Sequence, residues 1–183
     1  PYQGFRRTGI LNYASSDQVK VEGGFLRISA VRSASPADPA YPYDAGFVDT
    51  LGKWSRTYGR IEFRARFPFA GGVWYAIWGR PWTQSFPEID IEIINRPGDA
   101  TGQLYFVHNW AGEPLPADLR RAYVMRQNAD WSEWHTYTID WKPDSISWAV
   151  DGAVAMKATG EHVPKLPVYW MINSWVGGWP GNP

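Results

Sequence analysis

Three acidic residues are spaced two apart in one short segment, Glu88-Ile89-Asp90-Ile91-Glu92. Side chains alternate between the two faces of a β-strand, so Glu88, Asp90 and Glu92 would share one face and the isoleucines the other. The β-branched isoleucines favour a strand and predict a buried side. Because neighbouring carboxylates repel one another, the acidic side indicates a function rather than added stability.

Paired carboxyl groups at this spacing could hydrolyse a glycosidic bond. One group protonates the leaving oxygen, and the other attacks the anomeric carbon when the two lie roughly 5–5.5 Å apart, or activates water when they lie roughly 6.5–9.5 Å apart. On an extended strand the Cα atoms of Glu88 and Glu92 are about 13 Å apart, so leaning side chains could reach either separation. The spacing leans towards the retaining reaction and leaves the roles of the two glutamates open. Asp90 could hold one glutamate, so that one acid stays protonated while the other is ionised. A charged edge strand and a calcium site are the alternatives without catalysis.

The elements around this segment are short alternating runs separated by turn residues, which is typical of an all-β sandwich or barrel. We expect a hairpin within residues 19–30 with Leu26 and Ile28 inward, and room for a helical turn within residues 116–127. Asp151-Gly152 predicts a second hairpin turn. Further strands are expected at 60–67, 73–79, 103–110, 134–141, 145–150 and 167–176. No linker or repeat divides residues 1–183, which we expect to form one domain.

Composition limits the classes of partner. The chain has 18 Lys and Arg against 18 Asp and Glu, which argues against a nucleic-acid binder or a polybasic membrane-surface protein. It has no apolar run of about 18 residues, so no membrane-spanning segment is expected. Cysteine is absent, which excludes disulfides, thiol catalysis and cysteine-ligated zinc. The 12 Trp, 10 Tyr and 8 Phe residues exceed the usual need of a core this size and favour a cleft that stacks on sugar rings.

The acidic segment resembles the catalytic strand of glycoside hydrolase family 16, whose members cleave or transfer β-glucans and related polysaccharides. Other blocks resemble the family in the same order and cover most of residues 19–181. They are Tyr58-Gly59-Arg60-Ile61-Glu62, Trp134-His135-Thr136-Tyr137 with Asp140-Trp141, Trp148 to Gly152, and Met171 to Gly178.

The resemblance implies a β-jelly-roll sandwich of two curved antiparallel sheets with a sugar groove on the concave face. Glu88 would be the nucleophile, Glu92 the acid/base and Asp90 the assisting carboxylate. The residues expected to bind substrate are Trp74, Trp78, Phe86, His108, Trp110, Asn173 and Trp175. The alternative to substrate binding is an ordinary strand histidine for His108 and packing in the core for Trp74 and Trp110. We expect structural roles for His135, His162, Trp141 and Trp148.

The sequence departs from the family pattern in three ways. One residue separates Asp90 from Glu92, as in mixed-linkage glucanases and xyloglucan transferases, whereas many β-1,3-glucanases carry an extra residue. The segment Ala45-Gly46-Phe47-Val48 lacks the acid and arginine with which mixed-linkage enzymes hold sugar. The family usually adds a closing strand and calcium ligands beyond the point where this chain stops, at Pro183. We therefore expect terminal strands to have been trimmed or to be lacking, expect no required cofactor or metal, and leave a structural calcium open.

These observations predict a retaining endo-β-glucanase that acts on β-1,3 or mixed β-1,3-1,4 glucans. We expect a secreted monomer with a polysaccharide as its partner and with no nucleic acid or membrane partner. A transglycosylase on β-glucan or xyloglucan, a carbohydrate-binding protein without turnover and a structural calcium-binding domain are the alternatives. The sequence leaves linkage preference and product length open.

Overall fold

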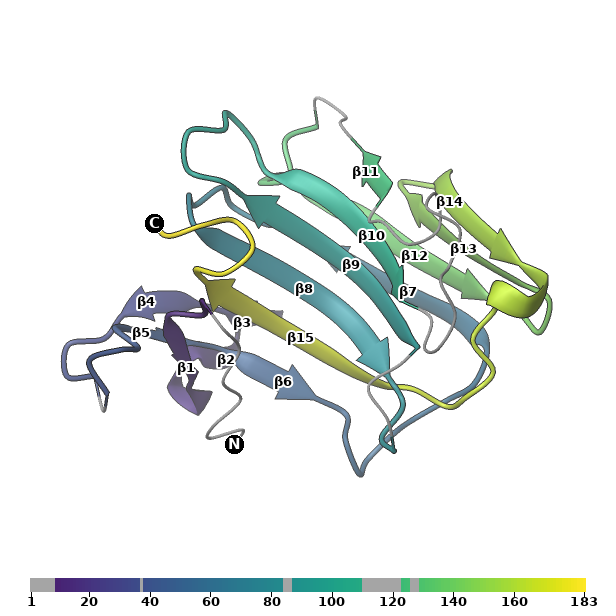
Figure 1. Cartoon of the computed structure of the whole chain (residues 1–183), viewed down its shortest axis with the longest axis horizontal. Coiled ribbons are helices and arrows are strands. Elements are labelled where there is room, and N and C mark those ends of the chain that lie inside the picture. The colour runs from purple at the N-terminus through teal and green to yellow at the C-terminus, as the bar shows by residue number, and fades with distance from the viewer. Residues whose placement is uncertain (1–8, 37, 84–86, 110–122, 126–128) are drawn as a thin grey trace.

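The computed structural model describes residues 9–36, 38–83, 87–109, 123–125 and 129–183, with only the backbone at 107–109 and 123–125. In these residues the chain is almost entirely β-structure: two large antiparallel sheets lie face to face, and two small sheets lie at one end (Figure 1). The all-β sandwich expected from the alternating runs is confirmed. None of the described residues belongs to a helix with the length and apolar character needed to cross a bilayer.

The six-stranded sheet has the order β11-β10-β9-β8-β15-β6, and every neighbouring pair is antiparallel. Its central strands β8 and β9 correspond to the expected runs. The strands are β6 (Phe47–Asp49), β8 (Val73–Arg80), β9 (Glu88–Asn95), β10 (Gln103–Asn109), β11 (Tyr123–Met125) and β15 (Tyr169–Val176). Part of the segment with room for a helical turn is therefore strand β11.

The four-stranded sheet has the order β14-β13-β12-β7. Its strands are β7 (Gly59–Ala65), β12 (His135–Trp141), β13 (Ser145–Val150) and β14 (Ala153–Thr159). Asp151 and Gly152 join β13 to β14 with φ values of 48° and 83°. Positive φ at both central residues is the conformation that a two-residue hairpin turn requires, so this predicted turn is confirmed.

The remaining elements are short. A three-stranded sheet contains β1 (Asn12–Ala14), β5 (Tyr43–Ala45) and β4 (Ala30–Arg32), in that order. Strands β2 (Val19–Glu22) and β3 (Phe25–Ile28) form the predicted hairpin. Two 3₁₀ turns are η1 (Ser16–Gln18) and η2 (Gly160–His162).

The prediction that Leu26 points inward is wrong. Leu26 is 47% exposed and Val21 on the paired strand is 82% exposed. Within the described residues β2 and β3 pair only with each other, and Val21 and Leu26 stay largely open to solvent. Phe25 is partly covered, because its ring stacks on that of Trp134 with 5.3 Å between the ring centroids.

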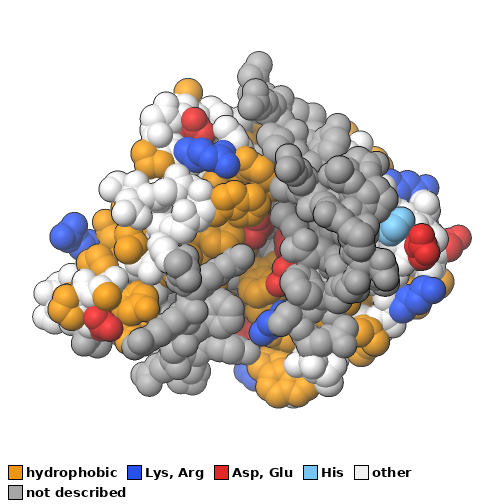
Figure 2. Space-filling model, in the orientation of Figure 1, with side chains coloured by type: hydrophobic (Ala, Val, Ile, Leu, Met, Phe, Trp, Pro, Cys, Tyr) orange, Lys and Arg blue, Asp and Glu red, His pale blue; other side chains and the backbone are white. Residues whose placement is uncertain are grey.

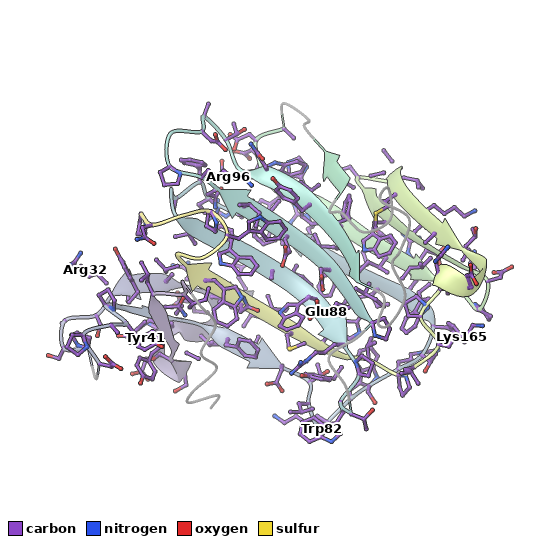
Figure 3. The ribbon with its side chains drawn as sticks, in the orientation of Figure 1. Arg32, Tyr41, Trp82, Glu88, Arg96 and Lys165 are labelled. Carbon is purple, nitrogen blue, oxygen red and sulfur yellow. The ribbon has the colours of Figure 1, made fainter. Side chains whose placement is uncertain are left out.

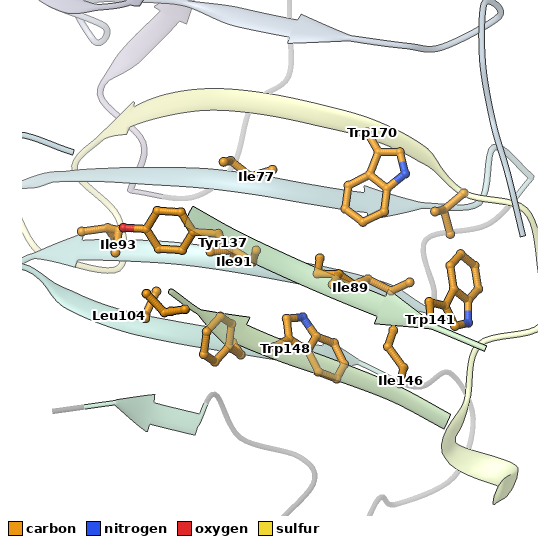
Figure 4. Close-up of a cluster of buried hydrophobic side chains, with 14 of the residues drawn as sticks. Ile77, Ile89, Ile91, Ile93, Leu104, Tyr137, Trp141, Ile146, Trp148 and Trp170 are labelled. Atoms are coloured by element: carbon orange, nitrogen blue, oxygen red, sulfur yellow. The ribbon is translucent and has the colours of Figure 1, made fainter. Parts of the chain in front are cut away.

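The main core fills the space between the two large sheets (Figure 4). Ile89, Ile91 and Ile93 of β9 are at most 1% exposed and face Tyr137 and Trp148 of the four-stranded sheet. Trp141 is also buried and donates from Nε1 to the Pro164 carbonyl oxygen at 3.0 Å. The structural roles expected for Trp141 and Trp148 are confirmed.

Candidate active site

The acidic residues of β9 lie on the side of the six-stranded sheet that faces away from the four-stranded sheet. We call this side the acidic face. Glu88 is half-buried there, Asp90 is 4% exposed and Glu92 is 8% exposed, while the intervening isoleucines occupy the core. Figure 2 shows acidic side chains recessed between apolar ones in the middle of this face. The alternation of side chains along β9 therefore gives the strand one apolar side and one acidic side, as predicted.

Strand register places specific neighbours beside the acids. On β8, Trp78 is opposite Asp90 and Ala76 is opposite Glu92. On β10, Tyr105 is opposite Glu92 from the other side. Ala76 carries only a methyl group and therefore leaves space above the sheet between Glu92 and β15. Trp78, two residues further along β8, provides a broad apolar surface.

Trp78 and Asn173 are joined although 95 residues separate them in the chain. Asn173 on β15 is opposite Ala76, and its Oδ1 accepts a hydrogen bond from Trp78 Nε1 at 2.8 Å. This bond fixes the orientation of a half-buried indole beside Asp90. The Nδ2 group of Asn173 is buried and has no hydrogen-bond partner among the described residues.

Trp74 and Trp175 lie further along the same face and are opposite each other. They are 3% and 5% exposed, and they pack with Ile10, Ile94 and Tyr105 in a second apolar cluster. The Trp179 ring approaches both Trp74 and Tyr105, with centroids 6.0 and 5.1 Å apart. At this end the face is thus covered by residues from both ends of the described chain.

Three other candidates cannot be placed as side chains. Phe86 and Trp110 lie outside the described residues. The backbone of His108 is described, and its register partner on β9 is Ile89 rather than an acidic residue. The side chain of His108 also lies outside the described part of the chain.

Sequence reasoning missed Arg80 and Tyr169, which end the face near Glu88. Arg80 continues the alternation of Trp74, Ala76 and Trp78, and Tyr169 is its register partner on β15. Arg80 Nε donates to the Tyr169 hydroxyl at 3.0 Å, and the guanidinium lies 5.9 Å from the centre of the Trp78 ring. Figure 3 shows Glu88 at the end of β9 that follows the loop bearing Trp82. Extending the two-residue period of β8 by one step would have found Arg80.

No described residues form a group of three or more His, Cys, Asp and Glu side chains arranged to hold a metal ion. The chemistry available on the acidic face is proton transfer and nucleophilic attack by carboxyl groups, beside an aromatic ring and an amide. Such a set suits the cleavage of a bond between sugars.

Comparison with known proteins agrees with this arrangement. The family model for glycosyl hydrolases family 16 matches residues 13–183. The chain belongs to this family. Its β-jelly-roll fold follows, and a solved family structure superimposes closely. The laminarinase catalytic domain from Thermotoga maritima MSB8 gives a TM-score of 0.80 at 26% identity, over 95% of this chain and 76% of that one.

Two relatives by sequence carry glucanase names. Glucan endo-1,3-beta-glucosidase A1 of Niallia circulans is 32% identical over 202 residues, which cover 96% of this chain and 29% of the relative. Endo-1,3-1,4-beta-glycanase ExsH of Rhizobium meliloti strain 1021 is 33% identical over 176 residues, which cover 93% of this chain and 36% of the relative. The chain thus spans about a third of the length of these relatives.

Proposed function

We propose that this protein is a retaining endo-β-glucanase acting on β-1,3 or mixed β-1,3-1,4 glucans. The observation that carries the proposal is the line of Glu88, Asp90 and Glu92 on the acidic face, with the opposite side of the same strand fully in the core. Three carboxylates at successive positions on one face of a strand repel one another and so disfavour folding. Their presence at the centre of a sheet is best explained by catalysis. Membership of glycosyl hydrolases family 16 and the names of its relatives support the same conclusion.

In the proposed reaction Glu88 attacks the anomeric carbon as Glu92 gives its proton to the departing sugar oxygen. The carbon–oxygen bond to the leaving sugar breaks, and an ester between Glu88 and the retained sugar forms. Glu92, now ionised, then takes a proton from water, which attacks the same carbon and releases Glu88 as a carboxylate. Asp90 lies between the two and holds one of them in position. No redox partner or metal is needed for either step.

The substrate is proposed to lie across the strands with one sugar ring against Trp78. The indole is held by Asn173, so its face is already oriented before substrate arrives, which reduces the entropy lost on binding. The buried Nδ2 of Asn173 is a donor that a sugar hydroxyl could satisfy. Because glucan polymers are too large to enter cells, we also propose that the protein acts outside the cell.

The test is release of reducing sugar from laminarin, barley-type glucan, xyloglucan and agarose. We expect activity on the first two, a rapid fall in viscosity before monosaccharide appears, and the β-anomer as the first product seen by NMR. First appearance of the α-anomer would contradict the retaining mechanism. Binding without release from any polymer would replace the proposal with a carbohydrate-binding role, and sugar transfer to an added acceptor in place of hydrolysis would replace it with transglycosylation.

A further inference from the structure

Arg80 is a cation placed beside the proposed nucleophile. The last register pair of β8 and β9 is Gly79 with Ile89, so Arg80 and Glu88 occupy the next positions of the two strands. Two contacts show that Arg80 lies on the acidic face: its guanidinium is 5.9 Å from the Trp78 ring centre and 6.0 Å from that of Tyr169. The arginine is half-buried.

The guanidinium is held in place by a hydrogen bond and not by an ion pair with a described residue. Its Nε donates to the hydroxyl of Tyr169, which is 2% exposed and therefore a rigid support. No ion pair of Arg80 occurs within the described residues, whereas Arg27 and Arg60 pair with Glu22 and Glu62 at 3.2 and 2.8 Å. The two terminal nitrogens of Arg80 thus keep donors that no described group uses.

A guanidinium with this geometry suits an anion carried by the substrate. Its planar fork matches the paired oxygens of a carboxylate or a sulfate, and prior fixing through Nε reduces the entropy lost on binding. Weak hydration and partial burial strengthen such a contact relative to a fully exposed one. A neutral glucan has no group that requires this charge, and the three acids nearby would repel an acidic polymer unless a cation offset them.

We propose that Arg80 binds an anionic substituent, a carboxylate or sulfate ester, on the sugar bound next to Glu88. The preferred substrate is then an acidic β-glucan rather than a neutral one. Trp82, which is 71% exposed with its ring 6.5 Å from that of Tyr169, would border the same position. This inference rests on the proposed function, because it assigns substrate chemistry to the same cleft.

The experiment compares laminarin with carboxymethyl and sulfated forms prepared from the same batch. For the wild type we expect kcat/KM on one or both anionic forms to exceed the neutral value by roughly five- to tenfold, as expected for one charge-assisted contact at a half-buried site. Arg80→Met should bring that ratio to about one or below, and 0.5 M NaCl should reduce it in the wild type. Comparison of the two anionic forms identifies which anion the site prefers.

Arg60→Met is the matched control, because it removes the same charge from an exposed residue on the four-stranded sheet. It should keep the wild-type ratio. An unchanged ratio in Arg80→Met, or a wild-type ratio of one or less, would overturn the proposal and leave Arg80 as a support for Tyr169.

A binding measurement separates failure of the proposed anion site from failure of the proposed glucanase activity. Retardation in native gels that contain each polymer measures binding without turnover. If the wild type cleaves none of the polymers, stronger retardation by anionic laminarin that is lost in Arg80→Met still supports the anion site. Equal retardation by neutral and anionic laminarin overturns it.

Discussion

At the scale of single residues, the acids of β9 differ in burial although they share one face. Glu88 is half-buried, whereas Asp90 and Glu92 are each less than 9% exposed. In the reaction proposed above, the more exposed Glu88 is the nucleophile and the more buried Glu92 is the acid/base.

The two roles can be separated with a small external anion. In Glu88→Ala, azide should occupy the place of the lost carboxylate and attack from the same side, giving an α-glycosyl azide from a β-linked substrate. In Glu92→Ala, an aryl β-glucoside with a good leaving group should still form the ester, and azide should replace water to give a β-glycosyl azide. Without azide, each variant should lose about a hundred- to ten-thousandfold in kcat or more.

NMR of the products checks this prediction, with circular dichroism to show that each variant is folded. The opposite pairing of variant and anomer would exchange the roles of Glu88 and Glu92. Absence of any azide product in both variants, with intact folding, would count against a glycosyl ester altogether.

At the scale of elements, β9 could be predicted from the sequence because one strand carries both a core side and an acidic side. The pairing of β8 with β15 could not be predicted, because it joins segments about ninety residues apart through backbone hydrogen bonds that any sequence can make. That pairing brings Asn173 to Trp78. The β2–β3 hairpin shows the opposite case, since local alternation predicted the strands but could not reveal that the Leu26 side chain stays exposed.

The Trp78–Asn173 bond should be measurable as a coupling between the two strands. Asn173→Leu removes the acceptor of the indole N–H, and Trp78→Phe removes the donor. We expect the double-mutant cycle to give a coupling of about 1 kcal/mol in the free energy of unfolding. The single Asn173→Leu variant should also raise KM, because the ring at position 78 is no longer fixed.

Urea unfolding of the four proteins and their KM values on laminarin give the two readouts. Trp78→Phe alone serves as the control for lost ring area. If Asn173→Leu costs the same in both backgrounds, the hydrogen bond contributes nothing to strand coupling.

At the scale of the whole molecule, we expect stability to depend on pH through the turn that joins β13 to β14. His135 Nδ1 lies 2.7 Å from Asp151 Oδ2, and His135 Nε2 lies 3.2 Å from the carbonyl oxygen of Asp130. Both ring nitrogens face acceptors, so only the doubly protonated imidazolium satisfies both contacts. Burial alone would lower the pKa of His135, but the bonds to Asp151 and Asp130 outweigh it and raise the pKa above 6.5. The hydrogen bond from His135, followed by that from the Thr136 N–H, lowers the pKa of Asp151.

These shifts define a pH window for the pair. The raised pKa of His135 contributes stability that is complete below 6.5 and is lost as pH rises through the folded value. The lowered pKa of Asp151 contributes stability that is present above 3.8 and is lost as pH falls through its folded value. His135→Gln should therefore lower Tm more at pH 5.5 than at pH 8.5. The difference should be small, about 2 °C, because the Asp151 side chain is about half exposed to solvent.

Calorimetry at the two pH values checks this prediction. Asp151→Asn, which keeps a residue that tolerates positive φ, should show the same pH dependence, and the double variant should lose no more than either single one. A Tm loss for His135→Gln that is equal at both pH values would show that the imidazolium adds no stability there.

The sequence by itself determined the all-β class, the acidic strand and its buried isoleucine side, and the Asp151-Gly152 turn. These follow from side-chain alternation and turn preference, which act between residues close in the chain. It also suggested the family through its motifs. Tertiary structure alone decided that Trp78 is held by Asn173, that Trp74 packs against both Trp175 and Trp179, and that Arg80 lies beside Glu88 and donates to Tyr169. Each of these contacts depends on the pairing and packing of segments that are distant in the chain. The local period of β8 could have placed Arg80 on the acidic face, but it could not have revealed Tyr169 or Glu88 as its neighbours.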